Sequence, residues 1–467
     1  MQSTKANIAY SLLLTLGNYI FPLLTYPYVS RVLGVTNIGI CNYVDSIVNY
    51  FVLFSTLGIL SVGIREIARS QHNKQQLSIV FSSLLTIHFC FSLLGCVVLV
   101  AVTYCIDSLM VYKSYLLIGV VKIIFNSFLI EWFYEGLSNF KYITIRSLLI
   151  KALYVVAIFS FIHTEKDTFC YYAITSLFFV VCGATINCSY SKKLVVFSCK
   201  NIKIKSYLLP ILSFGLYKVL TSMYTSFNVL YLGSTISDKE VGYFSTATKL
   251  YTIFMAVFSA YTSVMIPKVS KMIGNNENAQ LRQIASKTIN LVFFFSIPII
   301  IVSLFYAKPF VLLIAGEGYE GAIIPFRIVM SLLLVIALEQ IIITQFLMAT
   351  RDSKEVLLLS LVGAFVGVSA NIILVPRLAS IGSACSWVLS ECVVLLVAIW
   401  FFYKKIKVRV IQRQQAKYLL FCIPYFCFCL YFSTDAITPT LFYGLICCFV
   451  WFVLSYFIIV KKIKTSF

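Results

Sequence analysis

The chain has 467 residues, of which 60% are hydrophobic and 12% are charged, and its formal net charge is +20. Soluble globular domains contain about 25% charged residues, so this composition excludes a soluble globular protein and indicates a polytopic membrane protein. In a soluble protein, this positive net charge would suggest that the protein binds nucleic acid. In a membrane protein, lysines and arginines that set the orientation explain most of it, and we expect no nucleic-acid partner.

Fourteen apolar spans are predicted along the chain, each near the ~20 residues that a bilayer requires. They cover residues 8–29, 38–63, 78–104, 114–135, 145–162, 169–190, 206–232, 241–266, 288–306, 326–349, 355–375, 381–402, 418–433 and 440–460. The first span has no small-residue cleavage site before it, so we expect a retained helix and not a signal peptide.

The first span is interrupted by Pro22 and Pro27, and it ends in Arg31 and the turn signal Leu33-Gly34. Proline removes a backbone donor and kinks a helix. In lipid this is tolerated where protein or a water-filled cavity satisfies the freed carbonyls. A bent first helix with a cation at its end suggests a transport pathway.

The distribution of lysine and arginine predicts the orientation. With the N-terminus in the cytoplasm, the inside segments carry 26 of these residues and the outside loops carry 6. The excess of positive charge on one side predicts that both termini are cytoplasmic, which requires an even number of spans. The basic loops 191–205 and 403–417 are expected on the anionic inner leaflet.

An internal repeat divides the chain. Leu33-Gly34, Gly39 and Arg65 recur as Leu232-Gly233, Gly242 and Lys268. Because six spans separate the copies, we expect two similar lobes with the same orientation and a substrate site between them near the midplane. The predicted domains are residues 1–190, residues 206–402, and a C-terminal pair of spans with a basic tail at 418–467.

Several ionisable residues fall within the predicted spans, where each costs about 2.5–3.5 kcal/mol at a helix centre. Most must therefore face one another, helix ends or an aqueous cavity. Glu131, Lys151 and Arg327 lie near span ends, where long side chains can reach the membrane surface. The deeper residues are harder to explain in that way: Asp45, Lys122, Lys218, Lys249, Glu339 and Glu391.

Polar stripes accompany these charges. Asn42, Asp45 and Asn49 share one helix face, and the repeat places Ser245 and Thr248 on the matching stripe beside Lys249. We predict that the stripes line a cavity. The alternative is that they supply hydrogen bonds between helices.

The residue types suggest two roles. Arg31, Lys122, Lys218 and Lys249 are predicted to form a path for a diphosphate, because lysine and arginine bind phosphate. Asp45, Glu339 and Glu391 are predicted to couple transport to an ion, either H⁺ or Na⁺. The fifteen cysteines are expected to be core residues, and no metal site or other cofactor is expected.

Five segments together resemble bacterial O-antigen flippases of the MATE-like MOP superfamily. They are NYIFPLLTYPYVSRVLG at the first span, EWFYEGLSNFKYI (131–143), VGYFSTATKL (241–250), GEGYEGA (316–322) and SIGSACSWVLSECVV (380–394). The resemblance implies an all-α, V-shaped architecture of two six-helix lobes plus two C-terminal helices in the bacterial inner membrane. It also implies flipping of undecaprenyl-diphosphate-linked oligosaccharide repeat units for O-antigen and other lipopolysaccharide or surface polysaccharide biosynthesis. Contact with a polysaccharide polymerase and a chain-length regulator is expected.

Two other functions remain open at this point. One is a MATE-type antiporter for small cations, which buried lysines such as Lys218 and Lys249 disfavour. The other is a membrane enzyme, either a polysaccharide polymerase or an acyltransferase. A polymerase would require a long outside loop, and the sequence has none. An acyltransferase would require a reactive histidine, and of the histidines only His88 lies well within a span. We therefore expect a transporter and not an enzyme.

Overall fold

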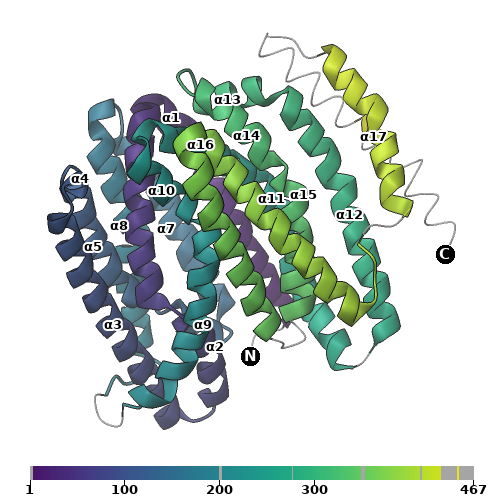
Figure 1. The fold of residues 1–467 in the computed structure, drawn as a ribbon. Helices are drawn as coiled ribbons and strands as arrows, with labels where there is room; N and C mark the ends of the chain where they lie inside the picture. The colour runs from purple at the N-terminus through teal and green to yellow at the C-terminus, as the bar shows by residue number, and fades with distance from the viewer. Residues whose placement is uncertain are drawn as a thin grey trace. The chain divides into compact units, whose positions relative to one another are not determined.

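The computed structural model describes residues 4–198, 202–275, 277–348, 353–410, 413–432 and 450–451. All regular secondary structure within these ranges is helical (Figure 1). The chain divides into two compact units, Met1–Ser234 (unit 1) and Thr235–Phe467 (unit 2). The prediction of an all-α polytopic membrane protein is confirmed.

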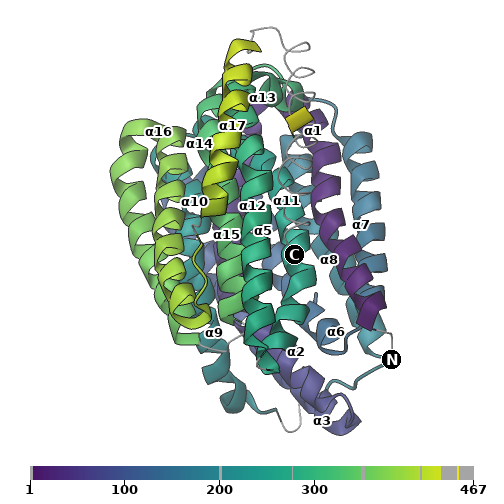
Figure 2. The same cartoon turned by 90° about the vertical axis from the view of Figure 1, so that its right-hand side faces the viewer.

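Unit 1 is a ring of packed helices. Helix α1 contacts α3, α3 contacts α5, α5 contacts α8, α8 contacts α7, and α7 returns to α1; α1 and α7 lie side by side at the right of Figure 2. The elements are α1 (Thr4–Thr56), α2 (Ile59–Ser70), α3 (Lys74–Cys105), α4 (Asp107–Met110), α5 (Lys113–Ser127), α6 (Glu131–Gly136), α7 (Phe140–Phe161), the 3-10 turn η1 (Glu165–Asp167), α8 (Thr168–Ser191), α9 (Ile204–Thr225) and α10 (Phe227–Thr235).

The first two predicted spans meet at a break inside α1. Gly34 has φ 74° and ψ 168°, a backbone conformation that is essentially restricted to glycine. A Cβ at this position would meet no atom within 4 Å, so backbone conformation and not crowding requires glycine here. The turn predicted at Leu33-Gly34 is confirmed.

The second half of α1 approaches α5 closely. A Cβ on Gly119 of α5 would lie 2.3 Å from Cγ2 and 3.3 Å from Cβ of Val48. These distances are shorter than van der Waals contact, so only glycine permits this separation of the two helices. The approach matters because Val48 and Gly119 each lie one turn from a charged residue described below.

The fourth predicted span, 114–135, is bent. Helix α5 ends at Ser127, Ile130 adopts φ 39°, and the short helix α6 follows. Trp132 of α6 is buried against Phe81, and a Cβ on Gly63 of α2 would come within 2.8 Å of its ring. Trp132 thus packs α6 against Phe81 of α3 and against α2, where Gly63 leaves room for its ring.

Unit 2 consists of α11 (Asp238–Gly274), α12 (Asn278–Phe305), α13 (Ala307–Ala315), the 3-10 turn η2 (Glu320–Ala322), α14 (Ile323–Met330), α15 (Leu332–Glu339), the π-helix η3 (Gln340–Leu347), α16 (Ser353–Ile406) and α17 (Arg413–Phe432). Helix α17 packs against α12, as Figures 1 and 2 both show. Glycine supplies left-handed backbone at Gly316 and Gly318, in the loop between α13 and η2.

Helix α16 contains two predicted spans, 355–375 and 381–402, joined at Ala379. This residue has φ 50° and ψ −127°, which interrupts the helix where the sequence predicts a loop. The backbone N–H of Ser380 donates a hydrogen bond of 3.1 Å to a carboxylate oxygen of Glu240 in α11. The second half of α16 thus begins with an acidic group at its N-terminus, where it interacts favourably with the helix dipole.

Within the described residues, eight helices are long and apolar enough to cross a membrane, or nine if the bent pair Glu320–Met330 and Leu332–Leu347 is one span. Two of the eight, Ala9–Ser70 and Lys354–Ile406, each include two predicted spans. The predicted span 440–460 lies outside the described residues except for 450–451. The total of fourteen spans stays a prediction, as do the lobe boundaries drawn from the repeat.

Candidate functional site

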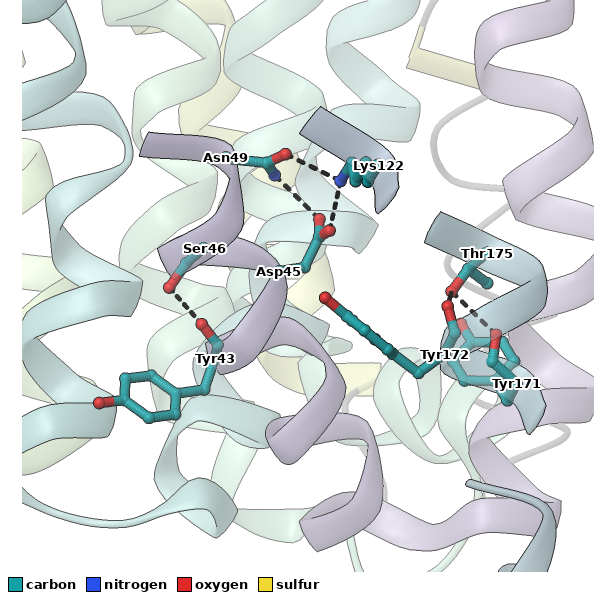
Figure 3. A network of polar contacts seen from close by, with 8 residues as sticks. All are labelled: Tyr43, Asp45, Ser46, Asn49, Lys122, Tyr171, Tyr172 and Thr175. Carbon is teal, nitrogen blue, oxygen red and sulfur yellow. Dashed lines mark hydrogen bonds and ion pairs between the residues drawn. The ribbon is translucent and has the colours of Figure 1, made fainter. Parts of the chain in front are cut away.

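The central polar feature of unit 1 is an ion pair between α1 and α5 (Figure 3). Nζ of Lys122 lies 2.5 Å from Oδ1 of Asp45 and donates to Oδ1 of Asn49 at 2.9 Å. Nδ2 of Asn49 donates to Oδ2 of Asp45, also at 2.9 Å. Because Asp45 and Asn49 are one helical turn apart, a single lysine reaches both. The result is a closed triangle in which the two charges cancel.

This triangle is only partly shielded. The Lys122 side chain is 13% exposed and that of Asp45 is 38% exposed. Tyr172 of α8 is buried, and its hydroxyl points toward Asp45 (Figure 3). Tyr115 of α5 packs edge-on against Tyr172, with ring centroids 5.4 Å apart. Tyr172, supported by Tyr115, therefore covers one side of Asp45, while the carboxylate keeps an accessible side.

The three predicted path cations that belong to unit 1 do not share one set of partners. Lys122 pairs with Asp45, whereas Nη1 of Arg31 donates to the carbonyl of Pro27 in its own helix at 2.7 Å. Lys218 of α9 interacts electrostatically with Glu135 of α6. The three cations of unit 1 thus have three different surroundings.

The predicted polar stripes are present as helix faces, but their members differ in role. Asn49 belongs to the triangle, whereas Asn42 donates to the carbonyl of Ile38 in the preceding turn. In unit 2, Thr248 bonds to the carbonyl of Ser245, and Lys249 is half-buried on the same helix. The Ser245 hydroxyl is buried without a hydrogen bond among the described residues. The unit 1 stripe forms a side-chain network with Lys122.

Two of the predicted coupling carboxylates meet inside unit 2. Glu339 at the end of α15 and Glu391 in α16 interact directly, and they are only 8% and 3% exposed. Nε1 of Trp387 donates to Oε1 of Glu391 at 2.9 Å. The Trp387 ring packs edge-on against Tyr251 of α11, with centroids 5.6 Å apart. This places the carboxyl pair beside the helix that carries Ser245 and Thr248.

A π-helix begins directly after Glu339. π-Helical turns are rare and occur frequently at functional sites. Its first residue, Gln340, donates from Nε2 to Oγ of Ser259 in α11 at 3.1 Å. Sequence periodicity gives no signal for such a turn. Among the described residues, no group of three or more His, Cys, Asp or Glu side chains could hold a metal ion.

Two charged partners were missed by the sequence analysis. Glu135 neighbours Lys218, and the spacing of Glu131 and Glu135 by one helical turn was an available signal. Arg146 is 4% exposed, and its Nη2 lies 2.6 Å from Oε1 of Glu131. Helix α7 begins at Phe140, earlier than the predicted span 145–162, so Arg146 lies more than one turn inside the helix and not at its start.

Comparison with known proteins adds two family matches. The family model described as polysaccharide biosynthesis protein matches residues 4–273. The model described as lipid II flippase MurJ matches residues 192–460. The two matches together extend over nearly the whole chain.

Relatives and solved structures are similar over most of their lengths. The chain is 21% identical over 408 residues to the "Putative O-antigen transporter" of Escherichia coli (strain K12), covering 85% of this chain and 96% of that protein. It is 25% identical over 291 residues to the protein of the same name from Shigella dysenteriae, covering 60% of this chain and 70% of that protein. The structure of lipid II flippase MurJ in an inward closed conformation matches with a TM-score of 0.77 at 14% identity, over 96% of this chain and 99% of that one. An inward-facing multidrug resistance MATE transporter of the MOP superfamily matches with a TM-score of 0.66 at 16% identity, over 83% and 94%.

Proposed function

Because the chain belongs to the polysaccharide biosynthesis protein family, we propose that it is a flippase for lipid-linked oligosaccharides. Its substrate is an undecaprenyl-diphosphate-linked repeat unit, which it carries across the bacterial inner membrane by alternating access. Both termini lie in the cytoplasm. The chain acts as a transporter and not as an enzyme, and it hands its product to a polymerase and a chain-length regulator.

The observation that carries this proposal is the coverage of the two family models. One concerns polysaccharide biosynthesis and the other concerns a lipid II flippase, and together they extend from residue 4 to residue 460. The membrane-embedded charges give the proposal its chemistry. A diphosphate requires cations, and a polar glycan requires hydrogen-bonding side chains along its route.

The Asp45–Lys122 pair suggests how substrate and ion compete. In the observed state Asp45 neutralises Lys122, so the lysine is not available to an anion. A proton or Na⁺ on Asp45 would release Lys122 for the diphosphate. Arrival of the diphosphate at Lys122 would in turn release Asp45 for the coupling ion. The exchange keeps the site close to neutral at each step, which limits the cost of charge in the membrane.

The carboxyl pair of unit 2 is the second proposed ion site. Two carboxylates in contact within an apolar interior repel each other unless a cation lies between them. A shared proton or a bound Na⁺ would satisfy both groups. Glu339 and Glu391 therefore act as a carrier for the coupling ion, with Trp387 holding Glu391 in place.

A second candidate is an antiporter for small cations, which the same acidic pair favours. The buried lysines argue against it less strongly than the sequence suggested, because Lys122 and Lys218 have acidic neighbours. The Glu339–Glu391 pair would suit an organic cation as well as a coupling ion.

The decisive experiment uses the purified chain in proteoliposomes. We expect transfer of an undecaprenyl-diphosphate-linked oligosaccharide from the outer to the inner leaflet, or the reverse, measured by access of a glycosidase added outside. Liposomes without the protein are the control. Absence of glycan transfer together with proton efflux on addition of an organic cation would reject the flippase and support the antiporter.

A further inference from the structure

A groove of about 570 Å³ lies on the surface of unit 1, between α7 and α8. Its long wall is apolar. Ile145, Leu149 and Leu153 follow one another at four-residue intervals on α7, and they are 45%, 60% and 59% exposed. Eight helical residues span about 12 Å, a length that suits a substantial part of an acyl chain. Ile186 of α8 forms the opposite wall.

One end of the groove is polar and basic. Asn139, Lys141, Tyr142 and Tyr190 line this end. The Tyr142 and Tyr190 rings stack with centroids 4.4 Å apart, and the Tyr142 hydroxyl donates to Oδ1 of Asn187 at 2.9 Å. The tyrosines are therefore fixed in place, and Lys141 stands exposed beside them.

Arg146 is a buried cation below this polar end, paired with Glu131. It lines the groove, although it is only 4% exposed. Its Nη2 binds Glu131 and Ser147, but Nε and Nη1 have no hydrogen-bond partner among the described residues. Buried guanidinium groups are normally fully hydrogen-bonded. These two nitrogens leave part of the guanidinium charge without a partner beneath the polar end of the groove.

The position of the groove in the membrane fits a lipid. The charge distribution of the sequence predicts that the N-terminal end of α7 faces the cytoplasm. The inner leaflet is the one rich in anionic lipids, and basic pockets between membrane helices on this side bind lipid head groups. An apolar wall running into the membrane from a basic mouth matches an acyl chain attached to a phosphate.

We propose that this groove binds an anionic phospholipid of the cytoplasmic leaflet. The phosphate lies at Lys141, with Arg146 contributing positive charge beneath it, and one acyl chain follows Ile145, Leu149 and Leu153. The site is separate from the Asp45–Lys122 triangle and does not depend on the proposed transport substrate.

Native mass spectrometry of the full chain, released from micelles containing equal amounts of phosphatidylglycerol and phosphatidylcholine, tests the proposal. We expect preferential retention of phosphatidylglycerol. Lys141→Gln should lower that retention about fivefold, since one surface lysine contributes about that much to binding an anionic lipid. Lys141→Arg should retain it. The matched control is Lys192→Gln, at an exposed lysine just after α8 that does not line the groove.

A second pair of variants tests the acyl-chain part. Leu149→Trp should fill the groove and reduce retention of both lipids. Val156→Trp, at a position on α7 that is 61% exposed and does not line the groove, should not. Size-exclusion elution establishes that each variant is folded. Equal retention of the two lipids by the original chain, or equal effects of Lys141→Gln and Lys192→Gln, would overturn the proposal.

Discussion

Lys122 is the residue whose interpretation changes most between sequence and structure. Considered alone in a predicted span, it suggests a cation that binds an anionic substrate. In the structure it already has two partners, Asp45 and Asn49. The sequence predicts different roles for them, ion coupling for Asp45 and diphosphate binding for Lys122. Their contact links those roles in one site.

The first prediction concerns this pair. Lys122→Gln or Asp45→Asn alone leaves one charge without its partner. We expect each to lower the free energy of unfolding by about 1–3 kcal/mol, less than for a sealed pair because the Asp45 side chain is 38% exposed. Thermal unfolding of the purified protein and its abundance in membranes measure this. The double variant should regain abundance.

Glycan export by the same variants separates a functional pair from a structural one. If Lys122 receives the diphosphate, the double variant is abundant but does not export. Recovery of both abundance and export in the double variant would contradict the proposed role. Lys192→Gln, at an exposed lysine, serves as the control for loss of one positive charge.

The second prediction concerns the unit 2 carboxyls. Glu339→Gln and Glu391→Gln should leave abundance nearly unchanged, because a neutral amide of the same size is less costly to bury than a carboxylate. They should remove the dependence of transport on a proton or sodium gradient, measured in proteoliposomes. Glu355→Gln is the control for loss of one carboxylate from unit 2. Glu355 pairs with Lys405 at 2.7 Å and is not part of the proposed ion site. Unaltered ion dependence in both variants would exclude this carrier.

At the scale of helices, the contact between α1 and α5 positions the triangle. Val48 lies three residues after Asp45, and Gly119 lies three residues before Lys122. The close approach of these two residues sets the distance at which the lysine meets the carboxylate. A packing requirement at a glycine therefore supports a polar contact one turn away.

The third prediction follows from that geometry. Gly119→Ala places a methyl group 2.3 Å from Cγ2 of Val48, so α1 and α5 must separate. Such overpacking costs about 1–3 kcal/mol, and we expect a lower unfolding temperature together with reduced export. Gly274→Ala is the control, because a Cβ there would meet no atom within 4 Å. Equal stability of the two variants would show that the helices can adjust without cost.

At the scale of the whole molecule, the described helices divide into two units, and each contains intramembrane carboxylates. In unit 1, Asp45 is already paired with the Lys122 side chain. Unit 2 offers Glu339 and Glu391 together. The two units therefore present different chemistry to an ion, although the sequence repeat relates them. A flippase with this arrangement would have two unlike ion sites.

The fourth prediction concerns topology. Single cysteines at Lys193 and Lys404 should react with membrane-impermeant maleimide only after the cells are opened, whereas one at Lys239 should react in intact cells. The excess of lysine and arginine in the inside segments is the physical reason. The background for these tests is a variant with its native cysteines replaced. Labelling of the Lys404 position from outside would reject the proposed orientation.

The sequence alone determined the class of protein and most helix boundaries. Its apolar content requires a membrane, and apolar runs near the ~20 residues that a bilayer requires indicate spanning helices, which satisfy their own backbone hydrogen bonds in lipid. Local signals also gave the break at Gly34, because its backbone conformation is essentially restricted to glycine. The loop near Ala379 and the family resemblance could likewise be predicted from the sequence.

Only the tertiary structure decided which charges meet. Helical periodicity identifies the face on which Asp45 or Lys122 lies, but it does not say which of the neighbouring helices that face will contact. Asp45 and Lys122 are 77 residues apart in the chain, and Glu131 of α6 meets Arg146 of α7 across the turn at Ser138, which has φ 56°. The π-helix after Glu339 has no periodic signal at all. These contacts depend on how the helices pack, which side-chain volumes throughout each unit determine together.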